Sequence, residues 1–519
     1  MSNRIPSKYQ KDIFNFVKTG NGNCVINAVA GSGKTTTIIA SLRFIPEDKS
    51  IIFLAFGKSI VEEIKAKVPP NVKVQTFHSL GASAIYKSYK GNSILDNNKI
   101  YDIIYNLAPR WAISDKKQID GDYRGRVKKI VDLARLSLAS DPIALADICY
   151  KHQIDVFDLE IERALKIIND ANNDISTFDF TDMIYWPANF DHFELQKYDY
   201  IFVDECQDLN KTQHRLIEKI SHANSRLILV GDPKQCIYGF AGADTESFEL
   251  LTKIPNTITL PLSVNYRCGK NILALAKNFV PQIEAFEFAI PGILDNNASV
   301  NNVLEGDMVL CRNTAPLVKL CLEYLRSNRK AYVKGADIGE ELIRMIVRSN
   351  TKSSKELKTW LDIEMKKIII LLKRKYPNMD DSQIKAHNTF TLFFEKHLLI
   401  NTIIDEENIT DTSILISKIR QIFLENSTGI CLSTIHKVKG LESDRVFILD
   451  REKTLPSKYA VLPWQREQER NLEYVAYTRA KEYLGIITNW TFYPEKEKEK
   501  EKKPKKQETN DNYDDYDTF

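Results

Sequence analysis

The sequence has few of the patterns that mark secreted, membrane-spanning or metal-binding proteins. Its eight cysteines include no C-x-x-C pair and follow no regular spacing, which argues against a zinc finger, an iron–sulfur centre or a disulfide framework and favours a reducing interior. Apolar runs such as Ile368–Leu372 are far shorter than the roughly 20 residues of a membrane-spanning helix. The first residues contain no apolar signal-peptide core. We therefore expect a soluble, intracellular protein.

A strong net charge is also missing. The chain has 72 Lys and Arg against 69 Asp and Glu, a formal net charge of +3. Bulk charge therefore does not demand a nucleic-acid partner, and any basic path for one must be local. Hydrophobic residues make up 43% of the chain and charged residues 27%, so it can build cores and is not disordered as a whole.

A phosphate-binding loop is the most informative feature of the sequence. Residues 28–35 read AVAGSGKT, after a short apolar run and before a helix that we expect over Thr36–Phe44. A strand, a glycine loop, a Lys-Thr pair and a helix form a P-loop, in which backbone N–H groups and the helix N-terminus hold phosphates. Lys34 can reach the β- and γ-phosphates, and the Thr35 hydroxyl can ligate Mg²⁺. Ala28 stands where the pattern usually has glycine. The expected nucleotide-binding residues of this loop are Ala30, Gly31, Ser32, Gly33, Lys34, Thr35 and Thr36.

A second nucleotide motif follows much later in the chain. The apolar stretch 200–203 ends in two adjacent carboxylates, Asp204 and Glu205. Asp204 would hold Mg²⁺, and Glu205 would orient and deprotonate the attacking water. Alone, this pattern fits a strand and a solvated acidic turn equally well. Combined with the P-loop, it indicates hydrolysis of a nucleoside triphosphate.

Strand and helix signals alternate in two regions, and each region is interrupted by a charged, mainly helical stretch. We therefore predict an α/β fold with two parallel-sheet domains, each carrying a mainly helical insertion. The predicted boundaries are residues 1–81 and 182–257 for the first sheet domain, 82–181 for its insertion, 258–339 and 427–493 for the second, 340–426 for its insertion, and 494–519 for a tail.

The tail has a composition of its own. Residues 495–506 are almost entirely Glu and Lys, and residues 507–519 contain acids and no base. The segment has little to bury, so we predict disorder. Its acidic, aromatic end resembles the tip of single-strand-binding proteins, and we hypothesise that it docks on a basic, apolar pocket of a replication or repair partner. A solubilising tail explains the composition equally well.

Further short blocks follow the P-loop and the paired carboxylates in a fixed order. They are PSKYQ at 6–10, LAFGK at 54–58, TFHSL at 76–80, LVGDPKQCIYGF at 229–240, NYRC at 265–268, CLSTIHKVKGLE at 431–442 and EYVAYTRA at 473–480. This set resembles superfamily 1 DNA helicases of the UvrD/Rep type, over both sheet domains but not over the insertions or the tail. The resemblance implies two RecA-like motor domains that close on ATP and Mg²⁺ and move along single-stranded DNA.

The resemblance also implies roles at the nucleotide. Gln10 would read the adenine edge, Tyr266 would stack on adenine, and Glu442 would contact the ribose. Gln235 would sense the γ-phosphate, and Arg479 would be the arginine finger, because negative charge builds on the γ-phosphoryl oxygens in the transition state. The implied catalytic residues are Lys34, Asp204, Glu205, Gln235, Arg267 and Arg479.

The implied DNA contacts are hydroxyl, imidazole and aromatic side chains, which suit phosphate contacts and base stacking. They are Phe56, Thr76, Phe77, His78, Tyr238, Phe240 and His436. Phe77 fits core packing about as well, and Phe240 stands where Trp is frequent. Cys-Ile-Tyr after Gln235 matches the UvrD/Rep group rather than the RecD-like group, which implies 3′→5′ travel and unwinding at single-strand/duplex junctions.

Two alternatives stay open at this point. The chain could be an ATP-gated clamp that strips or recruits other proteins, or an ATPase that acts on RNA, since phosphate tracking and stacking serve both nucleic acids. An intact set of Lys34, Glu205, Gln235 and Arg479 favours an active ATPase over a clamp. The sequence does not distinguish repair, recombination and replication.

Overall fold

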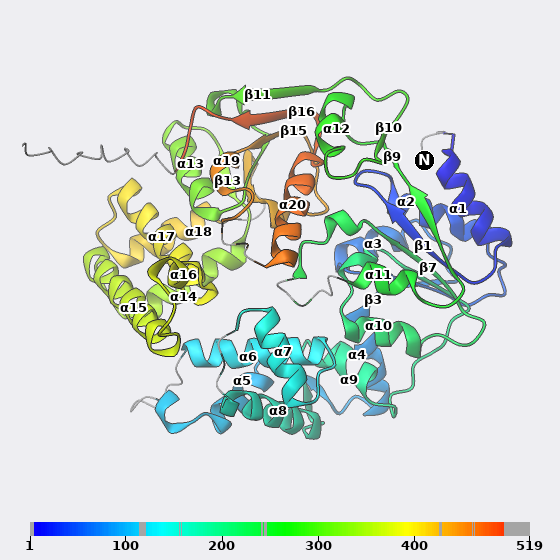
Figure 1. The fold of residues 1–519 in the computed structure, drawn as a ribbon, viewed down its shortest axis with the longest axis horizontal. Coiled ribbons are helices and arrows are strands. Elements are labelled where there is room, and N and C mark those ends of the chain that lie inside the picture. The colour runs from blue at the N-terminus through cyan, green and yellow to red at the C-terminus, as the bar shows by residue number, and fades with distance from the viewer. Residues whose placement is uncertain are drawn as a thin grey trace, which may run out of the picture.

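Two six-stranded sheets, in which every neighbouring pair of strands is parallel, form the frame of the molecule (Figure 1). The computed structural model describes residues 5–113, 121–154, 156, 158–239, 242, 246–424, 428–458, 460 and 462–492. The predicted class, α/β with two parallel-sheet domains and helical insertions, is confirmed. The predicted tail, residues 494–519, lies outside the described residues.

The first sheet has the order β3-β2-β6-β7-β1-β8. Its inner strands are short apolar runs, and alternate side chains enter two different cores, as the strand period of two requires. The strands are β1 (Asn23–Ala28), β2 (Ile51–Ala55), β3 (Val72–Thr76), β6 (Tyr200–Val203), β7 (Arg226–Gly231) and β8 (Thr257–Leu262). One face packs on α1 (Lys8–Thr19), α2 (Lys34–Ser41) and α3 (Lys58–Lys65). The other packs on α4 (Phe77–Ser88), α9 (Asp182–Asn189), α10 (Lys211–Lys219) and α11 (Ser247–Thr252).

The second sheet has the order β11-β16-β15-β12-β14-β13. Its strands are β11 (Ile293–Ala298), β12 (Met308–Cys311), β13 (Ala331–Val333), β14 (Ile430–Thr434), β15 (Ser443–Ile448) and β16 (Ala480–Ile487). One face packs on α12 (Lys270–Ala276) and α20 (Pro463–Tyr477), and the other on α13 (Thr314–Arg326). A parallel pair, β9 (Val264–Asn265) and β10 (Glu284–Ala285), lies between the sheets in the chain, and the short helix α19 (Arg451–Thr454) follows β15.

The first insertion is a helical body at the bottom of the view in Figure 1. It contains α5 (Lys99–Leu107), α6 (Gly121–Leu136), α7 (Pro142–Lys151), α8 (Asp158–Asn173) and the small parallel pair β4 (Ile94–Leu95) and β5 (Thr177–Phe178). A buried ionic cluster joins it to α9: Arg135 pairs with Asp179 at 2.8 Å and with Asp182 at 2.9 Å. The Arg135 carbonyl also accepts a 2.7 Å hydrogen bond from Thr212 of α10.

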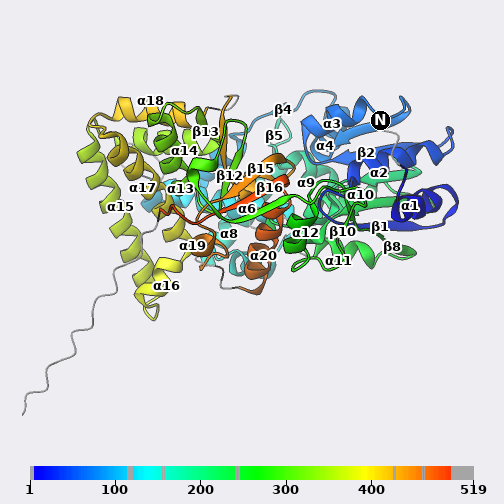
Figure 2. The same cartoon turned by 90° about the horizontal axis from the view of Figure 1, so that it is seen from above.

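The second insertion lies at the far end of the molecule from α1 (Figure 2). Its helices are α14 (Ala336–Ser349), α15 (Ser354–Lys375), α16 (Asp381–Ala386), α17 (Asn388–Glu407) and α18 (Thr412–Ile422). Apolar residues of α14, α15, α17 and α18 share one continuous core with α13 and the second sheet. The insertion is therefore packed directly onto its motor domain.

Two sequence-based boundaries differ from the structure. We expected the second sheet domain to begin at residue 258, but β8 pairs with β1 along its whole length, from Asn23↔Thr257 to Ala28↔Leu262, so the first sheet extends to Leu262. The helix after the P-loop begins at Lys34 and ends at Ser41, and a 3₁₀ turn continues to Phe44. In the described part of the chain, every helix is too short or too polar to cross a bilayer.

Candidate functional site

The P-loop lies at the carboxyl end of β1, next to β7. Gly31 and Gly33 have φ values of +64° and +75°, a left-handed conformation that favours glycine. Gly33 is the N-cap of α2, so the positive end of the helix faces the loop. A Cβ at Gly31 would lie only 2.7 Å from the Arg267 Cβ and from the Asn265 Nδ2. This glycine is therefore needed both for the turn and for the close approach of the NYR block.

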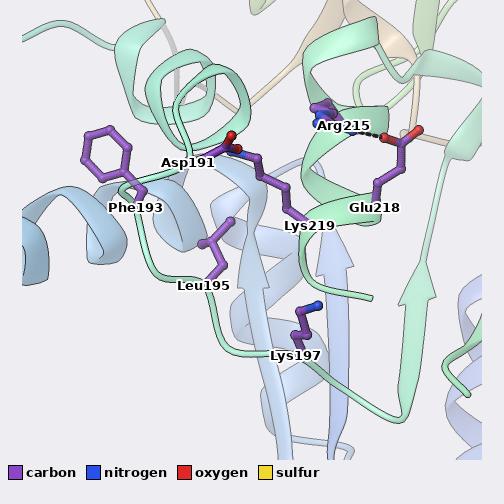
Figure 3. Close-up of a pocket in the computed structure, with 7 residues that line it drawn as sticks. All are labelled: Asp191, Phe193, Leu195, Lys197, Arg215, Glu218 and Lys219. Atoms are coloured by element: carbon purple, nitrogen blue, oxygen red, sulfur yellow. Dashed lines mark hydrogen bonds and ion pairs between the residues drawn. The ribbon is translucent and has the colours of Figure 1, made fainter. Parts of the chain in front are cut away.

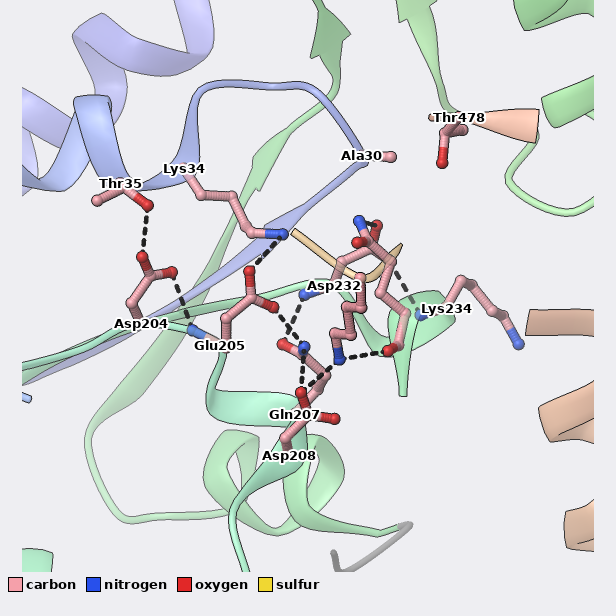
Figure 4. A network of polar contacts seen from close by, with 12 residues as sticks. Ala30, Lys34, Thr35, Asp204, Glu205, Gln207, Asp208, Asp232, Lys234 and Thr478 are labelled. Carbon is pink, nitrogen blue, oxygen red and sulfur yellow. Dashed lines mark hydrogen bonds and ion pairs between the residues drawn. The ribbon is translucent and has the colours of Figure 1, made fainter. Parts of the chain in front are cut away.

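The carboxyl end of β6 brings the two acidic residues to the P-loop (Figure 4). The Lys34 Nζ lies 3.3 Å from the Glu205 Oε1, and the Thr35 hydroxyl donates a 2.5 Å hydrogen bond to Asp204. The Ser32 hydroxyl is buried without a hydrogen-bond partner. An anion with several acceptor oxygens, such as a polyphosphate, would satisfy this group and compete for Lys34.

The donor set also fits a magnesium ion. A hydroxyl and a carboxylate are hard oxygen ligands, and Mg²⁺ in nucleotide sites takes only one or two protein ligands beside phosphates and waters. Thr35 and Asp204, which share a hydrogen bond, have oxygen donors of this kind. Among the residues that the structure describes, there is no cluster of three or more His, Cys, Asp or Glu that could hold a metal.

The surroundings shift the pKa values of the two carboxyl groups in opposite directions. Burial, with help from the neighbouring Glu205, raises the pKa of Asp204 to about 6. Burial also opposes ionisation of Glu205, but the charges of Lys34 and then Lys439 outweigh it and lower its pKa to about 2. Glu205 also has a φ of +54°, which is unusual for a side-chain-bearing residue and occurs often at functional sites.

A chain of hydrogen bonds leads from Glu205 across the ends of β6 and β7 (Figure 4). The Gln207 amide donates to Glu205 at 2.6 Å, and its oxygen accepts from the Asp232 N–H at 3.0 Å. Asp232 in turn accepts a 2.7 Å hydrogen bond from the Gln235 amide. Gln235 is thus connected through side chains to the paired carboxylates.

The second motor domain completes this chain. The Arg479 guanidinium lies 3.4 Å from the Gln235 Oε1 and donates to the carbonyls of Val475 and Leu441 at 3.1 Å each. Burial and the nearby Arg267 lower the pKa of Arg479 to about 10, so it remains protonated at neutral pH. Lys439 bonds to Asp208 and, at 2.6 Å, to the Gln235 carbonyl.

The candidate base residues Gln10 and Tyr266 lie close together, and the candidate ribose residue Glu442 pairs with Arg267. The Gln10 amide oxygen accepts from the Ser7 N–H at 3.1 Å, and its nitrogen donates to Thr37 of α2 at 3.0 Å. The Tyr266 hydroxyl lies 3.5 Å from the Gln10 oxygen. Arg267 forms a 2.5 Å ion pair with Glu442. Thr36 is exposed on the first turn of α2.

The candidate DNA residues are divided between surface and core. Phe56 is 37% exposed, and the His78 ring stacks on Phe180 with centroids 4.0 Å apart. Thr76 caps α4 by accepting from the Ser79 N–H at 3.0 Å. Phe77, which we expected among the DNA contacts, is only 1% exposed and packs in the core between the sheet, α4 and α9. It is a core residue. Phe240 lies outside the described residues.

Tyr238 and His436 lie where the two motor domains meet. The Tyr238 hydroxyl donates to the His436 carbonyl at 3.1 Å, and the Lys439 Nζ lies 5.0 Å from the centre of the Tyr238 ring. Burial lowers the pKa of His436 to about 3 and that of His78 to about 4. Both imidazoles are therefore neutral, and the expected phosphate contact of His78 would use a neutral N–H rather than a positive charge.

Several residues of this site were not singled out from the sequence. Gln207, Asp232, Lys439 and Tyr474 lie inside the recognised blocks, so block membership was the only signal for them. Phe180 lies in no block, although it is 56% exposed and stacks on His78. A single phenylalanine outside the recognised blocks gives no sequence signal of this kind.

A separate pocket of about 390 Å³ lies between residues 191–197 and α10 (Figure 3). Four of its charged residues pair with one another, Lys219 with Asp191 at 3.0 Å and Arg215 with Glu218 at 2.8 Å. This pocket contains none of the motif residues. We therefore assign nucleotide binding to the region around the P-loop and the paired carboxylates.

A P-loop, paired carboxylates at the end of another strand of the same sheet, and an arginine from the second sheet domain define a P-loop nucleoside triphosphatase with two motor domains. The family comparison is more specific. The profile of the UvrD/REP helicase N-terminal domain matches residues 9–255, and that of the UvrD-like helicase C-terminal domain matches residues 395–491. The chain belongs to the UvrD/Rep helicase family, and the resemblance noted in the sequence is confirmed.

Curated relatives cover the chain to different extents. The ATP-dependent DNA helicase PcrA of Staphylococcus epidermidis is 24% identical over 615 residues, with 92% of this chain and 82% of PcrA covered. The F-box DNA helicase protein 1 of Schizosaccharomyces pombe is 26% identical over 505 residues, with 88% of this chain covered. The ATP-dependent DNA helicase Rep of Buchnera aphidicola is 28% identical over 289 residues, with 51% of this chain covered. This chain spans 55% of the F-box protein and 44% of Rep.

Proposed function

We propose that the chain is an ATP-dependent DNA helicase that moves 3′→5′ along single-stranded DNA and separates strands at single-strand/duplex junctions in repair, recombination or replication. One observation carries this proposal. A continuous set of side-chain contacts connects Lys34 and Glu205 through Gln207, Asp232 and Gln235 to Arg479 of the other motor domain. Such a set makes the chemistry depend on how the two domains are placed.

In the proposed mechanism, the P-loop binds the phosphates of ATP and Lys34 turns toward the β- and γ-phosphates. Glu205 then loses the partner that chiefly lowers its pKa, and it becomes a better base for the attacking water. Thr35 and Asp204 would hold Mg²⁺, which neutralises charge on the phosphates when bound. Gln10, Tyr266 and Glu442 would bind the adenosine part.

The second motor domain would stabilise the transition state. Two backbone carbonyls hold the Arg479 guanidinium in a fixed orientation beside Gln235, so little reorganisation is needed when charge develops on the γ-phosphoryl oxygens. Arg267 would reach the same phosphate after sharing or leaving its ion pair with Glu442.

The same contacts would couple ATP to DNA. Gln235 and Tyr238 lie three residues apart, and Lys439 touches both the Gln235 carbonyl and the Tyr238 ring. A shift of Gln235 toward the γ-phosphate would therefore move an aromatic ring of the proposed DNA track, which also includes Phe56, Thr76, His78, Phe240 and His436. Aromatic stacking of this kind tolerates any base.

The first prediction is that single-stranded DNA stimulates ATP turnover and that Glu205→Gln lowers the stimulated kcat by at least about a hundredfold, as expected for loss of a general base. Glu218→Gln is the matched control, because Glu218 is an exposed partner of Arg215 away from the cleft. Steady-state ATPase rates with and without DNA oligomers give the comparison, and duplexes with 3′ or 5′ tails give the polarity.

RNA oligomers and protein-blocked DNA separate the alternatives. Turnover that responds to RNA but not to DNA would favour the RNA-directed ATPase, and removal of a bound protein without unwinding would favour the clamp. Turnover that survives Glu205→Gln would contradict the assigned chemistry. The proposed docking of the tail on a protein partner is supported by its sequence alone, and deletion of residues 508–519 followed by partner capture tests it.

A further inference from the structure

One face of α20 lies along the first motor domain. Glu467, Asn471 and Tyr474 are spaced four and three residues apart, so they share that face. The Glu467 carboxylate pairs with Lys234 at 2.8 Å, and the Asn471 amide donates to the Cys236 carbonyl at 3.0 Å. The helix thus follows the 232–238 block from its exposed end toward the P-loop.

The Tyr474 hydroxyl is at the inner end of this face and bonds to two different parts of the first domain. It accepts a 2.8 Å hydrogen bond from the Ala30 N–H of the P-loop and donates a 3.2 Å hydrogen bond to the Asp232 Oδ2. The Tyr474 side chain is completely buried. The same Asp232 oxygen also accepts from the Gln235 amide, so one phenol connects the P-loop backbone to the γ-phosphate-sensing block.

The peptide of Ala30 is held from both sides. Its N–H donates to Tyr474, and its carbonyl accepts a 2.6 Å hydrogen bond from the Asn265 amide. Val29 and Ala30 are also buried in the apolar cluster of the second domain, beside Val438 and Val475. The P-loop is therefore packed on the second domain at the point where its backbone turns toward the phosphates.

We propose that Tyr474 is a positioning residue through which closure of the two motor domains sets the P-loop and the Asp232–Gln235 block for hydrolysis. Its hydroxyl bonds can form only when α20 lies against the first domain. When the two domains separate, the Ala30 N–H and Asp232 lose the Tyr474 hydroxyl at the same time. The same domain movement therefore changes both groups. For its part in ATP hydrolysis, this inference rests on the function proposed above.

The test compares Tyr474→Phe with Tyr477→Phe. Both tyrosines are buried in α20, but the Tyr477 hydroxyl bonds to Arg451 at 2.6 Å and to Glu473 at 2.5 Å within the second domain. Tyr474→Phe removes buried hydrogen bonds that only the closed form contains. We therefore expect it to lower kcat/KM for ATP about tenfold and to change the affinity for ADP less than twofold. Tyr477→Phe should leave kcat/KM and ADP affinity unchanged.

Hydrogen exchange gives a readout that needs no turnover. In protein bound to a non-hydrolysable ATP analogue, which keeps the domains closed, the peptide that covers residues 28–33 should exchange its amide hydrogens several-fold faster in Tyr474→Phe than in wild type, and at the wild-type rate in Tyr477→Phe. If the wild-type protein showed no ATPase activity, the proposed function would be refuted. The hydrogen-exchange comparison would still test the Tyr474 contact in that case. Unchanged exchange and unchanged kcat/KM in Tyr474→Phe, or equal losses in both variants, would overturn the inference.

Discussion

At the scale of single residues, burial decides the charge of three histidines. Desolvation lowers the pKa of His78 to about 4, of His152 to about 4 with help from two lysines, and of His436 to about 3. Their folded pKa values lie below the value of about 6.5 that an unfolded chain has. The unfolded state therefore binds more protons between pH 6.5 and pH 4, so the stability that these groups contribute above pH 6.5 is lost as the pH falls.

We predict that the free energy of unfolding falls below pH 6.5, by at most ~1.4 kcal/mol per pH unit for each of these histidines. His436→Gln removes one of these titrating groups, so the free energy of unfolding should fall less steeply with decreasing pH than it does in wild type. His192→Gln, at an exposed position, should leave the slope unchanged. Urea denaturation between pH 7.5 and pH 5 measures both slopes, and identical slopes in wild type and His436→Gln would contradict the assignment.

The identity of the site residues was more predictable than their partners. Lys34 and Glu205 stand in short local patterns whose chemistry needs those residue types, and Arg479 stands in a block of the family resemblance, so the sequence predicts all three as site residues. The contacts of Gln207, Asp232 and Tyr474 depend on strands that are far apart in the chain, and no local pattern encodes them. Phe77 was ambiguous for a physical reason: a phenylalanine at the start of a helix suits a base pocket and a core equally well.

At the scale of elements, strands with continuous apolar runs were predicted, and the polar edge strand β11 was not. β2 and β6 are buried on both faces, and their sequences contain only apolar residues. β11 contains Asp and Asn, and its neighbour β16 has Lys481 and Glu482 after its first residue, Ala480. Residues 258–262 of β8 were assigned to the second sheet domain, although β8 pairs with β1, because periodicity does not encode which neighbour a strand pairs with.

The ionic cluster at the base of the first insertion gives a prediction for stability. Arg135 is completely buried between Asp179 and Asp182, with Lys99 3.4 Å from Asp182. Removal of the guanidinium leaves buried carboxylates short of a partner, so Arg135→Met should destabilise the protein by about 3–5 kcal/mol.

The control for this prediction is Arg215→Met in α10, where the pair with Glu218 is half exposed and the expected loss is below about 1 kcal/mol. Chemical denaturation followed by circular dichroism compares the two variants. A loss of less than 1 kcal/mol in Arg135→Met would mean that the cluster is not important for stability.

At the scale of the whole molecule, the two motor domains contact each other through buried polar groups as well as apolar ones. Lys439 of the second domain reaches Asp208 and the Gln235 carbonyl of the first. The sequence predicted a cleft between two α/β domains, but it could not predict how closely the domains approach, since that depends on the summed fit of many surfaces.

We predict that Lys439→Met weakens the coupling between DNA and ATP. Without the ammonium group, Asp208 is left buried without this partner and the Tyr238 ring loses a cation, so DNA stimulation of ATP turnover should fall about tenfold while turnover without DNA changes less. Lys437→Met is the control, because Lys437 pairs with Asp337 at a partly exposed position. ATPase titrations with single-stranded DNA measure the effect, and equal stimulation in both variants would argue against it.

The absence of a side chain at Gly31 affects how closely residues 265–267 approach the P-loop. Its backbone carbonyl accepts a 2.9 Å hydrogen bond from the Tyr266 N–H, and the space that a Cβ would fill is taken by Arg267 and Asn265. A methyl group at this position would clash with Arg267 and Asn265 and push them away from the P-loop. The absence of a side chain at Gly31 therefore also allows residues 265–267 to approach the loop this closely.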